Sequence, residues 1–264
     1  MALFQNPLWG FEMTYPDEWS QRSHAGADGF AQSAEVFDQA GNVNEQAAYM
    51  LVRGEFNGYR KEIAPLWNQY ITKLSVMLGA KKLGAAPFSM GGANGFEAEI
   101  QLPKKVNRRL WAGILARGTT ILHLMVSHPR EERESFEPVA SQIISSLRFL
   151  PRVQGVEMNE ESLPLPPNYR AVSPQKFVPD AADADFWQAY DGEGDLGALE
   201  AFYFRELPLH GWEIQEFIPF PNQVDVDFAR LRIRKGDVAA TLGILPFGKK
   251  YPIGKIVVKY EDVD

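Results

Sequence analysis

The chain has 264 residues, of which 45% are hydrophobic and 23% are charged, a balance typical of soluble globular proteins. Its net charge is −7 at pH 7. General nucleic-acid binding is therefore not expected, because that function depends on cations that neutralise phosphates. Cysteine is absent, which excludes disulfides, thiolate metal sites and a cysteine nucleophile.

The N-terminal sequence lacks the features of a secretory signal peptide, namely a basic segment, a long apolar segment and a small-residue cleavage site. No stretch approaches the roughly 18 apolar residues that a membrane-spanning helix needs. We therefore expect a cytoplasmic protein without a membrane span. An exported or anchored protein whose targeting segment has been removed would show the same features and stays an alternative.

Charge divides the chain into two parts. Residues 1–150 carry 15 Lys or Arg and 15 Asp or Glu, whereas residues 151–264 carry 12 and 19, so the second part holds the entire net charge. Composition changes near residue 150 as well, where a helix-like pattern gives way to a proline-rich stretch. This division predicts a domain at residues 1–150, a linker at residues 151–166 and a smaller domain at residues 167–264.

The linker contains several apolar side chains that need cover from solvent, namely Val153, Val156, Met158, Leu163 and Leu165. A free tether would be more polar. We therefore expect the linker to pack against one or both domains and to hold them in a fixed relation.

The first domain shows strands, a helix, three strands and a second helix. Alternation of apolar and polar residues predicts strands at residues 10–15, 29–37, 47–56, 96–102, 109–117 and 119–127. An apolar stripe predicts a helix over residues 63–78, with Pro65 near its start and with Gly79 and the pair Lys81 and Lys82 at its end. A second helix is predicted to start at residues 127–129 and to run to Leu147. Because the strand at residues 119–127 is apolar on both faces, we expect layers on both sides of the sheet.

Two short motifs in this domain resemble a known family. Gly10 and Phe11 are followed by Tyr15, Pro16 and Trp19, and the second helix ends in the sequence from Ile143 to Phe149, which closes with Ser-x-x-Phe. These motifs are similar to the opening and the end of the PsbP-like superfamily. Its members include an extrinsic photosystem II subunit, bacterial DcrB-type lipoproteins and a Ran-binding import factor.

The resemblance implies an α/β/α sandwich around an antiparallel sheet, used mainly for binding or assembly. The superfamily has no defining catalytic residues, so none is transferred to this chain. The sequence departs from the secreted members, because it has no lipobox cysteine.

The second domain is predicted to be a small α+β unit with a helix on an antiparallel sheet. The helix begins after Asp195, a suitable N-cap, carries an apolar stripe from Leu196 to Leu207 and stops at Gly211. Strands are predicted at residues 185–190, 212–218, 226–234, 238–245 and 253–260.

One acidic turn has part of a metal-binding pattern. Asp191, Glu193 and Asp195 have the spacing of the first half of an EF-hand loop, but Leu196 stands where the loop needs glycine and Phe202 where it needs glutamate. We favour a capped acidic turn and keep a weak cation site as the alternative.

A basic connection places Lys104, Lys105, Arg108 and Arg109 within six residues. We favour a solvated loop here, and the alternative is a contact with an anion or an acidic partner. The glycine-rich residues 91–95 are read as a hairpin loop, because no helix follows that could bind phosphate. His123 is interpreted as a core histidine with satisfied hydrogen bonds.

No enzyme motif or cofactor motif is recognisable, and we expect no cofactor. The sequence favours a non-enzymatic, two-domain binding or assembly module with a protein partner. The alternative is a hydrolase-like enzyme of small molecules with its site in a cleft between the domains.

Overall fold

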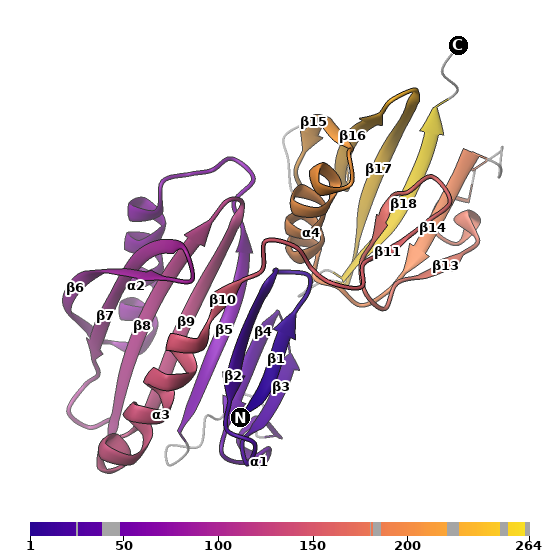
Figure 1. The fold of residues 1–264 in the computed structure, drawn as a ribbon. Helices are drawn as coiled ribbons and strands as arrows, with labels where there is room; N and C mark the ends of the chain where they lie inside the picture. Colours follow the sequence, from indigo (N-terminus) through magenta and orange to yellow (C-terminus); the bar gives the residue numbers. More distant parts are fainter. Residues whose placement is uncertain are drawn as a thin grey trace. The chain divides into compact units, whose positions relative to one another are not determined.

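The computed structural model describes residues 1–24, 26–38, 48–179, 181, 186–220, 227–248 and 253–261 (Figure 1). The chain forms two compact units. Unit 1 comprises Met1–Asn6 and Gly10–Leu150, and unit 2 comprises Pro7–Trp9 and Pro151–Asp264. In the part of the chain that is described, no helix has both the length and the apolar character needed to cross a membrane.

Within its described residues, unit 1 is built on an antiparallel sheet of seven strands in the order β3-β4-β5-β9-β8-β7-β6. The strands are β3 (Ser20–His24), β4 (Ala27–Ala31), β5 (Tyr49–Phe56), β6 (Lys81–Met90), β7 (Ala93–Gln101), β8 (Arg108–Arg117) and β9 (Thr120–Pro129). The meander predicted for the last three strands is confirmed, because each pairs antiparallel with the next.

Two helices cover opposite faces of this sheet (Figure 1). Helix α2 (Ile63–Leu78) buries Trp67 and Ile71 against the side chains of β7, β8 and β9 that point to its side. It ends at Gly79, whose left-handed φ of 60° suits glycine. Helix α3 (Arg133–Ser146), preceded by the 3-10 turn η1 (Arg130–Glu132), packs on β2 and β9 through a buried stripe that includes Phe136 and Ile143. Unit 1 is therefore an α/β/α sandwich around an antiparallel sheet, as predicted.

A second, three-stranded sheet joins the start and the end of unit 1. It contains β1 (Ala2–Asn6), β2 (Phe11–Tyr15) and β10 (Arg148–Phe149), with β2 in the middle. In this sheet Phe149 lies opposite Phe11, so the two motifs that carry the family resemblance pair with each other. Trp19, at the end of the first motif, stacks on Phe136 of α3 with ring centroids 5.3 Å apart. Residues of the two motifs therefore pack in the same part of the core of unit 1.

Three of our assignments in unit 1 are wrong. The strand predicted at residues 29–37 ends at Ala31, because the hydroxyl and carbonyl of Ser33 accept backbone N–H bonds that turn the chain into helix α1 (Glu35–Asp38). Residues 127–129 do not start a helix, since they continue β9 and pair with β8 up to Pro129. Lys81 and Lys82 do not end α2 but begin β6, which had not been predicted.

Unit 2 has a helix on one face of an antiparallel sheet, as predicted. Six described strands have the order β13-β14-β18-β17-β16-β15. They are β13 (Arg170–Val172), β14 (Trp187–Asp191), β15 (Glu213–Ile218), β16 (Ala229–Lys235), β17 (Val238–Phe247) and β18 (Ile253–Glu261). Helix α4 (Leu196–Leu209) packs on the sheet through Leu199, Phe202 and Tyr203, all without exposed surface. A short 3-10 turn, η2 (Pro174–Lys176), lies between β13 and β14.

The predicted linker lies within unit 2. It forms the short ladder of β11 (Glu157–Met158) and β12 (Pro164–Leu165). Leu163 is fully buried in the core of unit 2, and Val156 and Leu165 pack against that core. Of the five apolar side chains that needed cover, Met158 stays the most exposed, at 37%.

The short segment Pro7–Trp9 also belongs to unit 2. Arg205 of α4 holds it, donating hydrogen bonds to the carbonyl oxygens of Leu8 (3.0 Å) and Pro7 (2.7 Å). The third guanidinium nitrogen of Arg205, Nε, lies 2.7 Å from Oε1 of the fully buried Glu206. Leu8 packs against the same core as the helix.

Candidate functional site

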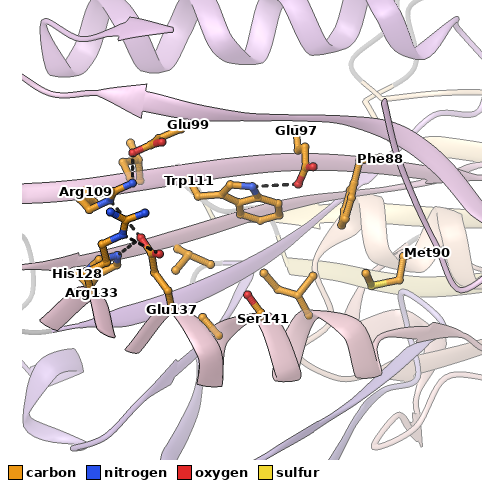
Figure 2. Close-up of a pocket in the computed structure, with 14 residues that line it drawn as sticks. Phe88, Met90, Glu97, Glu99, Arg109, Trp111, His128, Arg133, Glu137 and Ser141 are labelled. Atoms are coloured by element: carbon orange, nitrogen blue, oxygen red, sulfur yellow. Dashed lines mark hydrogen bonds and ion pairs between the residues drawn. The ribbon is translucent and has the colours of Figure 1, made fainter. Parts of the chain in front are cut away.

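A pocket of about 420 Å³ opens in unit 1 between helix α3 and strands β6, β7 and β8 (Figure 2). The pleat of the sheet explains its lining, because side chains two apart on a strand share a face. Glu97 and Glu99 of β7 and Arg109 and Trp111 of β8 point to the α3 side, whereas their neighbours contribute to the core beneath α2. Glu137 of α3 approaches the pocket from the other side.

One end of the pocket is a network of charges. Arg109 forms an ion pair with Glu99, and its Nε lies 3.1 Å from Oε1 of Glu137. Nε of Arg133 lies 3.2 Å from the second oxygen of the same carboxylate. His128 is 3% exposed; its Nδ1 donates to the carbonyl oxygen of Pro129 at 2.7 Å, and its Nε2 lies 3.3 Å from Oε1 of Glu137. Glu137 is thus the centre of the network.

The other end is an aromatic corner. The rings of Phe88 and Trp111 meet edge to face, with centroids 5.7 Å apart and an interplanar angle of 82°. The indole lies across Gly113, where a Cβ would come within 2.7 Å of the ring, so only glycine leaves room for it. Nε1 of Trp111 donates a hydrogen bond of 3.1 Å to Oε2 of Glu97. Met90 completes this corner, as Figure 2 shows.

The pocket does not place a hydroxyl nucleophile against its histidine. A histidine base must contact the hydroxyl or thiol that it activates. Among the described residues that line the pocket, Ser141 alone carries a hydroxyl, and no hydrogen bond joins it to His128. The polar groups can instead hold a shape and a charge pattern in place, which is a requirement for recognition.

The structure separates the four cations of the basic connection. Lys104 and Lys105 lie in an exposed turn. Arg108 is 7% exposed; its Nε donates to the Ser127 hydroxyl at 2.9 Å, and its guanidinium lies over the Tyr49 ring. Arg109 turns to the opposite face, into the pocket. The four residues therefore do not form one surface patch.

The three acidic residues of the predicted turn have different surroundings. Asp195 caps α4, with Oδ1 accepting hydrogen bonds from the backbone N–H groups of Gly197 (3.0 Å) and Ala198 (3.3 Å), so the predicted N-cap is confirmed. Asp191 binds the ammonium groups of Lys176 and Lys255, whose hydrogen bonds hold the pKa of its carboxyl below the ordinary value. Glu193 is exposed. Across the described ranges, no three His, Asp or Glu side chains are placed to hold a metal ion.

His123 lies on the α2 side of the sheet, outside the pocket. Its Nε2 is 2.8 Å from Oε2 of Glu55, and this hydrogen bond lowers the pKa of the Glu55 carboxyl. The Tyr70 ring meets the imidazole edge to face, and burial raises the pKa of that phenol. One ring nitrogen is therefore satisfied as expected, while the buried Nδ1 has no protein partner.

Sequence reasoning missed the pocket itself. One signal was present, because Glu97, Glu99, Arg109 and Trp111 interrupt two strands whose other face is apolar. Charged residues two apart on neighbouring strands share a face, so the sequence could have indicated a polar surface there. The position of Glu137 above that surface follows only from the packing of α3.

Comparisons with known proteins give similarities of structure alone. No protein-family model and no curated protein matches the sequence. The chain is similar to cyanobacterial PsbP from Synechocystis (12% identity, TM-score 0.42, covering 56% of this chain and 91% of that chain). It is also similar to LpqN from Mycobacterium tuberculosis, described as involved in cell envelope biogenesis (14% identity, TM-score 0.43, covering 53% of this chain and 83% of that chain). A third similar structure is the Ran-binding protein Mog1p from Saccharomyces cerevisiae (10% identity, TM-score 0.37, covering 53% of this chain and 90% of that chain). Each of these three similarities covers about half of the chain.

Proposed function

We propose that this protein is a non-enzymatic binding module that engages a protein partner through the pocket of unit 1. The observation that carries the proposal is the pairing of the polar groups in the pocket with one another. The carboxylates and guanidiniums at one end bind each other, which fixes a surface without leaving a nucleophile beside a base. Interfaces commonly place an aromatic anchor in such a rigid, partly polar hollow.

The position of the aromatic corner supports a macromolecular partner. Phe88 and Met90 belong to β6, which is one of the two edge strands in the described seven-stranded sheet. An edge strand leaves backbone N–H and C=O groups unpaired, and an extended segment of another protein can bind to them. A partner lying along β6 would therefore reach the pocket with its side chains.

The exposed lysines of the turn before β8 offer a secondary contact. We retain the predicted acidic-partner contact for Lys104 and Lys105, because Arg108 and Arg109 are held inside unit 1. Charge reversal of these two lysines should weaken binding of the partner and make it less sensitive to salt. Unchanged affinity and unchanged salt dependence would remove this contact from the proposal.

Site-specific photo-crosslinking tests the main proposal. A benzophenone amino acid is introduced at Met90, in the pocket, and in a control chain at Tyr59, which is 67% exposed elsewhere on unit 1. On irradiation in the native host, we expect a defined protein adduct from position 90 and not from position 59. With the purified adduct partner, Trp111→Ala should weaken binding by about 2 kcal/mol or more, the size of a hot-spot effect. No protein adduct at position 90, or the same adducts at both positions, would overturn the proposal.

A further inference from the structure

We propose that the pocket takes a cationic side chain, an arginine of the partner, with Glu97 as its counter-ion and the rings of Trp111 and Phe88 as its walls. This inference rests on the proposed function and names the chemistry that the partner must present. It starts from an asymmetry between the two ends of the pocket.

The charges at the α3 end are matched within unit 1. Glu99 pairs with Arg109, and Glu137 pairs with both Arg109 and Arg133. Two carboxylates thus face two guanidiniums. Among the described residues of the pocket, Glu97 is the carboxylate without such a cation, and the group that contacts it is the indole N–H of Trp111.

The hydrogen bond from Trp111 orients Glu97 without neutralising it. The indole donates to Oε2 at 3.1 Å, which leaves the lone pairs of Oε1 for another donor. The indole is itself held by contact with the backbone at Gly113 and by the edge of Phe88. Figure 2 shows the carboxylate beside the indole nitrogen, with Phe88 and Met90 on the same side of the indole as Glu97 in this view. The acceptor is therefore in place before a ligand arrives.

An aromatic pair beside a carboxylate favours one class of ligand. A cation is attracted by the faces of indole and phenyl rings as well as by the negative charge. Guanidinium fits better than ammonium, because it is planar, weakly hydrated and able to stack on a ring while donating to a carboxylate. An anion would be repelled by Glu97, and a neutral apolar side chain would remove water from a charge without replacing it.

The test uses blocked pentapeptides with glycine and serine around a central arginine, compared with the same peptides carrying lysine, citrulline or norleucine. Citrulline has nearly the shape of arginine but no charge. Binding is followed by the nitrogen–proton NMR signal of the Trp111 indole, assigned from the Trp111→Phe variant. We expect the arginine peptide to shift this signal, the lysine peptide to bind more weakly, and both affinities to fall as salt is added. Citrulline and norleucine peptides should leave the signal in place.

Glu97→Gln is the decisive variant. Glutamine keeps an oxygen that accepts the indole hydrogen bond, so the fold and the reporter signal should persist. Affinity for the arginine peptide should fall about tenfold, the effect expected when a hydrogen bond to a charged group loses its charge. Glu134→Gln, which changes an exposed carboxylate of α3 outside the pocket, should leave the affinity unchanged. Equal binding of arginine and citrulline peptides, or equal affinity in the Glu97→Gln variant, would overturn the inference.

The failure of this inference can be told apart from failure of the proposed function. If a crosslinked partner loses affinity with Trp111→Ala but not with Glu97→Gln, the partner uses the pocket without a cation, and the inference alone is wrong. If no peptide shifts the indole signal and no adduct forms at position 90, both are wrong.

Discussion

Replacing Glu200 with glutamine should make unit 2 more stable at neutral pH. Glu200 lies on α4 with only 4% of its surface exposed, and its Oε1 has no protein partner. Burial raises the pKa of the carboxyl from its ordinary value of 4.5 to about 8, despite a hydrogen bond from the backbone of Phe220, and the charge of Asp195 adds to the rise. At pH 7 the folded protein therefore keeps this carboxyl protonated.

The size of the effect follows from proton linkage. Below pH 4.5 both the folded and the unfolded chain hold the proton, and the free energy of unfolding is not reduced. As the pH rises toward 8, the unfolded chain releases the proton and the folded chain does not, so each pH unit lowers the free energy of unfolding by about 1.4 kcal/mol. The loss is about 3 kcal/mol at pH 7, and it stops growing above the folded pKa. Glutamine has no proton to release and removes this loss.

The assay must report on unit 2 alone. Urea unfolding can be followed by fluorine NMR of a fluorotryptophan at Trp212, which is 1% exposed in the core of that unit. The native chain and the Glu200→Gln variant should have similar stability near pH 5 and diverge by about 3 kcal/mol at pH 7. Glu213→Gln, at an exposed position of β15, is the matched control and should show no such divergence. Parallel curves across this pH range would refute the reasoning.

Three further predictions concern a close backbone contact, a helix cap and a buried charge. Gly95→Ala would place a Cβ 1.7 Å from the carbonyl oxygen of Ile114, so β7 and β8 must separate, and we expect a loss of about 3 kcal/mol with faster hydrogen exchange in β7. Asp195→Ala should cost about 1 kcal/mol in urea unfolding, whereas Asp195→Asn keeps the capping oxygen and should cost much less. Arg108→Met should destabilise unit 1 by about 2 kcal/mol because it removes a buried charged donor, while Lys105→Met, in the exposed turn, should change the melting temperature little.

Elements with a strong periodic pattern could be predicted from the sequence. Helix α2 follows its apolar stripe, and the meander β7–β8–β9 follows alternation, because each buries a regular face. The glycine-rich residues 91–95 form the predicted hairpin, in which Gly91 and Gly92 both have positive φ between β6 and β7. Local chemistry and tertiary packing agree at these positions.

The elements that the sequence did not predict either bury few side chains or contain residues that locally favour a different structure. Strand β6 is an edge strand that is exposed along most of its length and contains Pro87, so no alternating pattern marks it. Ser127 and Pro129 resemble a helix start, but pairing with β8 keeps them in the sheet. The candidate site shows the same limit, because the contact between Arg109 and Glu137 depends on where α3 lies across the sheet.

The hydrogen bond between Arg205 and Leu8 joins residues 197 positions apart, and this separation sets an order of events during synthesis. Leu8 is synthesised before Arg205, and at about 5 to 20 residues per second Arg205 follows roughly 10 to 40 seconds later. The strands of unit 1 can therefore pair before Arg205 is available to bind the Pro7–Trp9 segment. A fragment beginning at residue 151 would lack this segment and leave two donors of Arg205 without their acceptors, so a single cut cannot separate the chain into two whole units.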